Sequence, residues 1–169
     1  MSEFKRVGKF EFVSYDNFKS SFDNLDEALI KEMYENLKKP ARATKGSAGY
    51  DFYLPMDITL NPGETIKIPT GIRVSMLDNY VLKIYPRSGL GFKYRLQLNN
   101  TVGIIDSDYY YSDNEGHIFA KITNDSNENK SLSLKKGDAF MQGIFVEYGI
   151  TFDDDVKDIR NGGFGSTSK

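Results

Sequence analysis

The sequence predicts an all-β chain folded as a jelly-roll-like β-sandwich, with one extra α-helix near the N-terminus. Three observations lead to this prediction. From Tyr50 onward, short runs alternate in the manner of strands, turn sequences such as 61–64 and 136–138 separate them, and only one earlier segment shows helical periodicity. Many short strands divided by regular turns are typical of sandwiches and jelly rolls.

The elements follow in order along the chain. Residues 9–14 alternate as a strand does, and the helix is expected at about 23–39. Ser21 or Asp23 can cap this helix, and Pro40 stops it. Its apolar stripe, expected to pack against the domain, recurs at Leu25, Leu29, Met33 and Leu37. Seven further strands are expected at 51–54, 58–60, 65–68, 72–74, 80–85, 117–122 and 143–148.

The length of 169 residues fits one domain with a core of its own. We expect a single domain over 1–169. It divides into an N-terminal strand and helix (1–39), a β core (40–159) and a flexible, glycine-rich tail (160–169).

Composition excludes several functional classes. No apolar run is long enough to span a bilayer, and the first residues lack the apolar stretch of a signal peptide, so we expect no membrane partner and a cytoplasmic location. The chain has no cysteine, which excludes thiolate chemistry. A net charge of −2 argues against nucleic acid as a partner. The one histidine, His117, lies in a polar stretch and is expected in a solvated loop.

Five segments combine residues that suit chemistry. In 43–51, small residues lead into a strand that opens with Asp51, which can equally be a local acceptor in a tight turn. In 85–91, Arg87 and Ser88 precede glycines whose N–H groups can cradle an anion. Arginine in a glycine turn is also common without any ligand.

The third segment, 98–109, reads as a hairpin around Asn99-Asn100. Its mouth can present main-chain groups to the polar edge of a base, although asparagine-rich turns are usually only turns. Asp106 follows the apolar pair Ile104-Ile105, so its carboxylate is expected at the rim of a buried strand. A carboxylate held there can orient a water as a general base.

The fourth segment, 137–144, contains Gln142 in an otherwise apolar strand, so this amide points either to solvent or into a pocket. The fifth is the tail. Phe164, flanked by glycines, suits stacking on a flat ligand, and Ser166 and Thr167 suit phosphate oxygens. The alternative for this terminus is a frayed end.

Taken in this order, the five segments resemble the five motifs of the trimeric dUTP pyrophosphatases, the dUTPases. The resemblance covers about residues 40–169, and its motifs lie at 47–51, 86–91, 103–109, 137–144 and 160–167. It implies a jelly-roll subunit in a homotrimer whose three active sites each use all three chains, the tail closing a neighbour's site. The implied reaction is dUTP + water → dUMP + pyrophosphate with Mg²⁺, which limits uracil in DNA and supplies dUMP for dTMP synthesis.

The resemblance also implies a role for each matching residue. Asp106 would hold the attacking water and the sugar 3′-hydroxyl, and Tyr109 would pack against the deoxyribose and exclude a 2′-hydroxyl. Mg²⁺ would be held by substrate phosphates and water, with no direct protein ligand. Uracil would be bound by Asn100 and Gly103 of the hairpin and stacked by Phe164. Asp51 would support the site without touching substrate. The residues that would bind phosphates are Arg87, Ser88, Gly89, Gln142, Arg160, Gly165, Ser166 and Thr167.

Three departures from the family pattern stand out. Arg160 is one residue out of register with the glycine-rich motif, which puts its contact with the γ-phosphate in question. Tyr110–Asn114 resembles an insertion, and the N-terminal strand and helix are longer than usual. Insertions of this sort resemble those of dUTPases from bacteriophages of Gram-positive hosts, some of which bind a repressor; the location would then be the host cytoplasm. Tyr109, Tyr110 and Tyr111 are expected to form an exposed, protein-binding patch.

Two alternatives stay open at this point. A dCTP deaminase shares the fold, but its chemistry needs an acid–base group, normally a glutamate, and segment 98–109 contains none. A catalytically silent regulatory protein would not need Asp106, Arg87, Ser88 and Phe164, which are all present.

Overall fold

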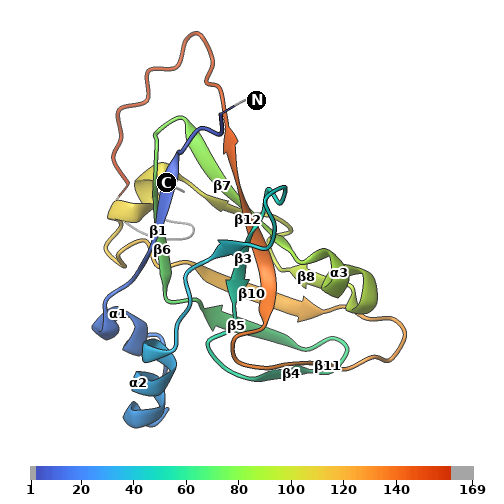
Figure 1. The fold of residues 1–169 in the computed structure, drawn as a ribbon. Coiled ribbons are helices and arrows are strands. Elements are labelled where there is room, and N and C mark those ends of the chain that lie inside the picture. The colour runs from blue at the N-terminus through green and yellow to red at the C-terminus, as the bar shows by residue number, and fades with distance from the viewer. Residues whose placement is uncertain (1–2, 161–169) are drawn as a thin grey trace.

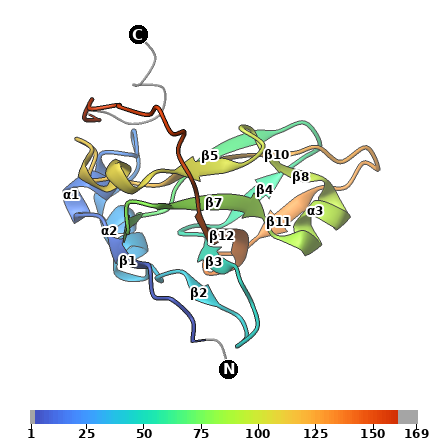
Figure 2. The ribbon, with the colours of Figure 1, turned by 90° about the horizontal axis from the view of Figure 1, so that it is seen from above.

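The computed structural model describes residues 3–160, and most of its ordered elements are strands (Figure 1). A five-stranded antiparallel sheet has the order β2-β3-β12-β7-β9, and a three-stranded one has the order β5-β10-β8. Figure 2 shows these sheets as two layers seen edge-on. Their strands are β2 (Ala41–Arg42), β3 (Tyr50–Tyr53), β12 (Ala139–Glu147), β7 (Tyr80–Pro86), β9 (Gly103–Ile105), β5 (Thr65–Pro69), β10 (Phe119–Asn124) and β8 (Leu96–Leu98).

Two antiparallel pairs complete the β structure. One joins β1 (Gly8–Phe12) to β6 (Ile72–Met76), and the other joins β4 (Ile58–Leu60) to β11 (Leu132–Leu134). Every strand expected from the sequence is present with small shifts of its ends. Strand β10 begins at Phe119 and not at His117. Strands β8 and β9 are the two runs expected to flank Asn99-Asn100, and β2 and β11 are additional.

The main core lies between the layers. Its completely buried members include Ile68, Leu82 and Phe140, which come from three different strands. Because successive side chains of a strand point to opposite faces, each strand contributes alternate apolar residues to this core. The ring of Phe10, which contacts the rings of Tyr50, Phe52 and Phe145, joins β1 to this core. The result is the sandwich that the alternation predicts.

The expected N-terminal helix is present but shorter than predicted. It is α2 (Glu27–Glu35), and it begins after Asp26, whose side chain accepts a hydrogen bond from Leu29 N at 3.2 Å. Asn24, with φ of 59°, takes a left-handed conformation that a helix through 23 does not allow. Ile30 and Met33 are buried, whereas Leu29 is 43% exposed, so only part of the predicted stripe packs.

Two further helices lie at opposite ends of the molecule (Figures 1 and 2). Helix α1 (Tyr15–Lys19) is capped by Ser14 and packs beside α2 around Phe18. Helix α3 (Ser88–Tyr94) occupies the glycine-rich stretch that was expected to be an open turn, and the left-handed Arg95 ends it. No helix in the described residues is long and apolar enough to cross a membrane.

Candidate active site

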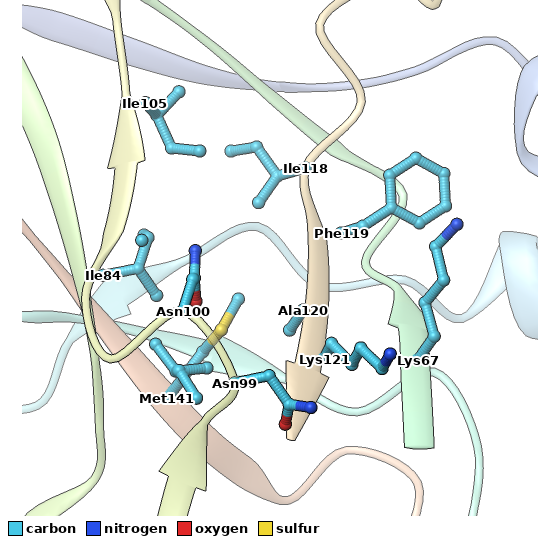
Figure 3. A pocket seen from close by; sticks show the side chains of 12 residues that line it. Lys67, Ile84, Asn99, Asn100, Ile105, Ile118, Phe119, Ala120, Lys121 and Met141 are labelled. Carbon is cyan, nitrogen blue, oxygen red and sulfur yellow. The ribbon is translucent and has the colours of Figure 1, made fainter. Parts of the chain in front are cut away.

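A pocket of about 500 Å³ opens where the two layers separate (Figure 3). Strand β8 pairs with β10 in one sheet and β9 pairs with β7 in the other, so the chain crosses between sheets through residues 99–102. The predicted hairpin is therefore wrong in its pairing: the two strands diverge, because each has a better partner in its own layer. The lining residues are Lys67, Ile84, Leu98, Asn99, Asn100, Gly103, Ile105, Ile118, Phe119, Ala120, Lys121 and Met141.

The walls of this pocket are apolar and its mouth is polar. Figure 3 shows Ile84, Ile105 and Ile118 around the interior and Asn99 and Asn100 on the connecting turn. A tight turn fixes this connection: Thr101 N donates to Leu98 O at 2.8 Å, and Val102 N donates to Asn100 O at 2.8 Å. An apolar slot with a few placed polar groups is the usual form of a small-ligand site.

Gly103 has a steric reason to be glycine. A Cβ built on it would lie 2.8 Å from the Cβ of Ile84, closer than packed atoms tolerate. The missing side chain lets β9 approach β7, and Gly103 lines the pocket wall. Asn100 and Gly103, both predicted to bind a base, therefore line one pocket.

Asp106 follows β9 directly and opens the 3₁₀ helix η1 (Ser107–Tyr111). Its Oδ2 accepts a hydrogen bond from an Arg160 terminal nitrogen at 2.6 Å, and Asp108 Oδ1 accepts one from Arg160 Nε at 2.9 Å. The Arg160 side chain is only 15% exposed between these carboxylates. A guanidinium that bridges two carboxylates makes charge-assisted bonds to both. Arg160 thus contacts the predicted general base of its own chain.

Tyr109 is buried, which corrects the expectation of an exposed tyrosine patch. It is 4% exposed and belongs to the main core, whereas Tyr111 is 80% exposed. Tyr110 lies between these extremes: its hydroxyl donates to Glu11 at 3.0 Å, and the Arg73 guanidinium lies 3.7 Å above its ring. Only Tyr111 of the three presents its ring to solvent, because η1 turns the other two toward the body of the molecule.

His117 is also buried, which corrects its assignment to a solvated loop. It is 0% exposed, its Nε2 accepts from Gly71 N at 2.9 Å, and its Nδ1 lies 2.9 Å from Asn17 Oδ1. An Nε2 that accepts a bond leaves Nδ1 as the donor. Burial lowers the pKa of His117 to about 4, with a smaller effect from Lys67. Local sequence carried no signal of this burial, because the partners are distant in the chain.

The residues predicted to bind phosphate gather at a second place. A pocket of about 570 Å³ contains Arg87 and Ser88 at the start of α3, together with Gln142. Asp51 Oδ1 lies 3.5 Å from Arg87 Nε, and Gln142 Nε2 donates to Pro86 O at 3.3 Å. The side chain of Asp51 therefore sits beside the arginine, where a supporting residue was expected. Gly89 lines an adjoining hollow, also with Arg87.

The two pockets lie on opposite faces of the five-stranded sheet. Ile84 and Met141 line the first pocket, and the residues that follow them, Tyr85 and Gln142, line the second. Alternate side chains of a strand point to opposite faces, so one chain presents the groups predicted to bind the base and those predicted to bind phosphate to different sides.

The register adds distance along the sheet. Ile105 lies opposite Leu82, five residues before Arg87, which at the rise of a strand is roughly 16 Å. Asp106 is one residue further on. The structure thus brings the predicted site residues into two groups, and does not join them within one chain.

Some predictions fall outside these groups. Phe164, Gly165, Ser166 and Thr167 lie outside the described residues. Within 3–160, no three side chains of His, Cys, Asp or Glu gather into a metal-binding group.

A dUTPase family model matches residues 35–168. The deoxyuridine 5′-triphosphate nucleotidohydrolase of Lactococcus lactis is 39% identical over 144 residues, covering 83% of this chain and 95% of that protein. Its counterpart from Finegoldia magna is 42% identical over 135 residues, covering 76% and 90%.

Solved structures agree with this result. The crystal structure of dUTPase from Streptococcus mutans has a TM-score of 0.62 at 32% identity and covers 84% of this chain and 97% of its own. The dUTPase of Staphylococcus bacteriophage 80alpha with dUPNHPP has a TM-score of 0.64 at 22% identity, covering 98% and 100%, which shows the shared fold. A mutant dUTPase of phage phi11, at 20% identity, is described with a structural Mg(II) ion; its TM-score is 0.64 and it covers 90% and 98%. The chain therefore belongs to the dUTPase family and is a dUTP-hydrolysing enzyme, a deoxyuridine 5′-triphosphate nucleotidohydrolase.

Proposed function

We propose that the enzyme cleaves dUTP to dUMP and pyrophosphate by attack of a water held by Asp106 on the α-phosphorus. The carboxylate of Asp106 orients the water and takes its proton as the new P–O bond forms on the α-phosphorus. The bond from the α-phosphorus to the bridging oxygen breaks, and pyrophosphate leaves with that oxygen. The position that supports this role is the end of β9, one residue after Ile105 of the base pocket. Arg160, bound to Asp106 in this structure, has to give up part of that contact to the water.

The first pocket is the proposed uracil site. Its apolar walls accept the flat ring, and main-chain groups around Gly103 together with the Asn100 amide pair with the polar edge of the base. Cytosine reverses one donor and one acceptor on that edge. A site with groups left unpaired discriminates strongly, so dCTP is expected to be rejected. Tyr109, three residues after Asp106, is proposed to pack against the deoxyribose.

The second pocket is the proposed triphosphate site. Arg87, fixed by Asp51, supplies a guanidinium, and Ser88 and Gly89 supply N–H groups at the start of α3. Gln142 adds an amide donor. We expect the tail, with Phe164, Gly165, Ser166 and Thr167, to close over the base and the γ-phosphate, and Arg160 to approach that phosphate once released from the carboxylates.

Mg²⁺ fits this arrangement as a partner of the substrate. Mg²⁺ prefers oxygen ligands and keeps several waters, and it is commonly bound through substrate phosphates. Its proposed contribution is to neutralise charge on the triphosphate as pyrophosphate leaves. Asp106 and Asp108 are each engaged by Arg160, so the chain's own residues are proposed to hold water and nucleotide rather than the ion.

We propose that the complete site forms only in a homotrimer. The opposite faces of the two pockets carry this inference, since one dUTP cannot contact Asp106 and Arg87 of the same chain across roughly 16 Å of sheet. A second chain must supply the phosphate site. The segment after β12 supports the same conclusion, because it leaves four large apolar side chains largely exposed, namely Ile150, Phe152, Val156 and Ile159.

The test is pyrophosphate release from dUTP with Mg²⁺, with dCTP, dTTP and UTP measured in parallel. Turnover of dUTP alone is expected, and it would support a role in keeping uracil out of DNA and in supplying dUMP. Ammonia release from dCTP would instead support a deaminase, and no turnover of any nucleotide would support a silent regulatory protein.

A second role in binding a repressor protein is favoured by one observation, the solvent-facing ring of Tyr111 in the insert Tyr110–Asn114. The phage 80alpha enzymes are described as controlling transfer of virulence genes. Tyr111→Ala tests this role better than deletion of the insert, because Tyr110 anchors the insert to Glu11 and Arg73. Unchanged affinity of the variant for every candidate repressor would rule this surface out.

A further inference from the structure

The N-terminal helix α1 contacts residues 114–117, which follow η1. Asn17 uses both ends of its amide: Nδ2 donates to Asn114 O at 3.0 Å, and Oδ1 lies 2.9 Å from His117 Nδ1. The neighbouring Ser14 donates from its N–H and its hydroxyl to Glu115, each at 3.0 Å. Four hydrogen bonds from a five-residue helix and its cap thus hold residues 114–117.

The same turn holds the hydroxyl of Tyr109 from two sides. Asn114 Nδ2 donates to Tyr109 Oη at 2.9 Å, and Tyr109 Oη donates to His117 O at 2.6 Å. Burial raises the pKa of Tyr109, which keeps the phenol protonated as this donor. Asn114 and His117, the two residues that Asn17 binds, are therefore also the two that fix the tyrosine ring.

The turn that makes these contacts is tightly packed. Gly116 has a φ of 70°, and a Cβ on it would lie 2.7 Å from Tyr109 O and from Tyr110 Cα. The turn therefore lies close against η1, and Asn17 is hydrogen-bonded to it at Asn114 and His117. Side chains linked by hydrogen bonds are held in place more strongly when the network is buried than when it is exposed.

We propose that Asn17 is a positioning residue for the sugar selectivity of the enzyme: it holds the 114–117 turn, and through that turn the ring of Tyr109. The proposal rests on the proposed packing of Tyr109 against the deoxyribose. It gives the N-terminal extension a part in substrate discrimination, exerted through Asn114 and His117 and without contact to the nucleotide.

The test compares kcat/KM for dUTP and for UTP in Asn17→Ala. This ratio does not depend on the fraction of active protein, so partial unfolding leaves it unchanged. We expect the ratio to fall about tenfold, because the variant leaves buried partners unpaired and the ring loosely held. The loss should appear mainly in the KM for dUTP and in gained UTP turnover, with kcat for dUTP nearly retained. A ratio within about twofold of the original would overturn the proposal.

A double-mutant cycle separates positioning from general destabilisation. In a Tyr109→Phe background, which lacks the hydroxyl that the turn holds, Asn17→Ala should have no further effect on the ratio. If the two substitutions lowered the ratio independently, so that their effects multiplied in the double variant, the proposed route through Tyr109 would be overturned. Glu27→Ala is the matched control, since it breaks the exposed ion pair with Lys19 in the same extension and should keep the ratio. If Tyr109→Ala itself leaves selectivity intact, the sugar-packing role fails, and this inference fails with it.

Discussion

The contact of Arg160 with Asp106 and Asp108 is a feature that the residue types in the sequence did not predict. Two carboxylates, two residues apart, bind one guanidinium at 2.6 and 2.9 Å. From the sequence, Asp106 was identified by its place after Ile104-Ile105, and Arg160 was assigned to a phosphate. The ion pair adds that the residue leading into the glycine-rich tail contacts the side chain of the predicted general base.

The two carboxylates make a matched pair for mutation. Asp106→Asn should reduce pyrophosphate release from dUTP by about 10³-fold, because an amide cannot take the proton of the attacking water. Asp108→Asn removes an equivalent contact to Arg160 and should cost far less. Steady-state turnover of both variants, with nucleotide binding followed by calorimetry, checks this. Equal losses in the two variants would mean that the ion pair, and not the general base, is what catalysis requires.

His117 gives a prediction about pH and stability. Its pKa is about 4 in the folded chain and near 6.5 when unfolded, so the unfolded state binds a proton first as pH falls. Stability should therefore drop between pH 6.5 and 4, by up to about 3 kcal/mol from this residue, and show no further loss from it below pH 4. The His117→Gln variant should be less stable at pH 7, but its free energy of unfolding should fall less steeply between pH 6.5 and 4. Urea unfolding at fixed protein concentration across this range is the measurement, and parallel slopes for the two proteins would refute the assignment.

Among the elements, those with a local signal were predictable and those that depend on a distant partner were not. The strands follow from alternation, and α2 follows from its periodicity, but its start at Glu27 is set by the left-handed Asn24 and the Asp26 cap. Helix α3 carries Gly89 and Gly91, which disfavour helix, so its sequence indicated a turn. The divergence of β8 and β9 is set by β10 and β7, partners that the 98–109 segment does not contain.

The base pocket exists because β9 approaches β7 at Gly103, and this element can be tested by one methyl group. Gly103→Ala places a Cβ 2.8 Å from Ile84 Cβ, so β9 has to shift at the pocket wall. We expect the KM for dUTP to rise about tenfold or more. Overpacking should lower the free energy of unfolding by about 1–3 kcal/mol. Gly46→Ala, where nothing lies within 4 Å of the added methyl, is the control. Kinetics and thermal unfolding that match between the two variants would show that the close approach is unimportant.

For the whole molecule, the sequence named candidate site residues but did not indicate how the fold distributes them. The motifs lie in one chain, yet the sheet places Gly103 and Gln142 on opposite faces, a consequence of strand parity that appears only once the pairing of β7, β9 and β12 is known. If these residues form one site, as we propose, a second copy of the chain is needed to bring its two halves together.

Subunit mixing tests this directly. Asp106→Asn and Arg87→Ala should each be inactive alone, because every site in either assembly lacks one of the two groups. If each site takes its Asp106 from one chain and its Arg87 from another, co-refolding equal amounts leaves both groups intact in about one quarter of the sites, and about that share of activity should return. The same proteins mixed after separate folding should stay inactive until subunits exchange. Should co-refolded assemblies of confirmed mixed composition stay inactive, the two residues would have to act within one chain, and the separation of the two pockets would need to close by a large movement of the sheet itself.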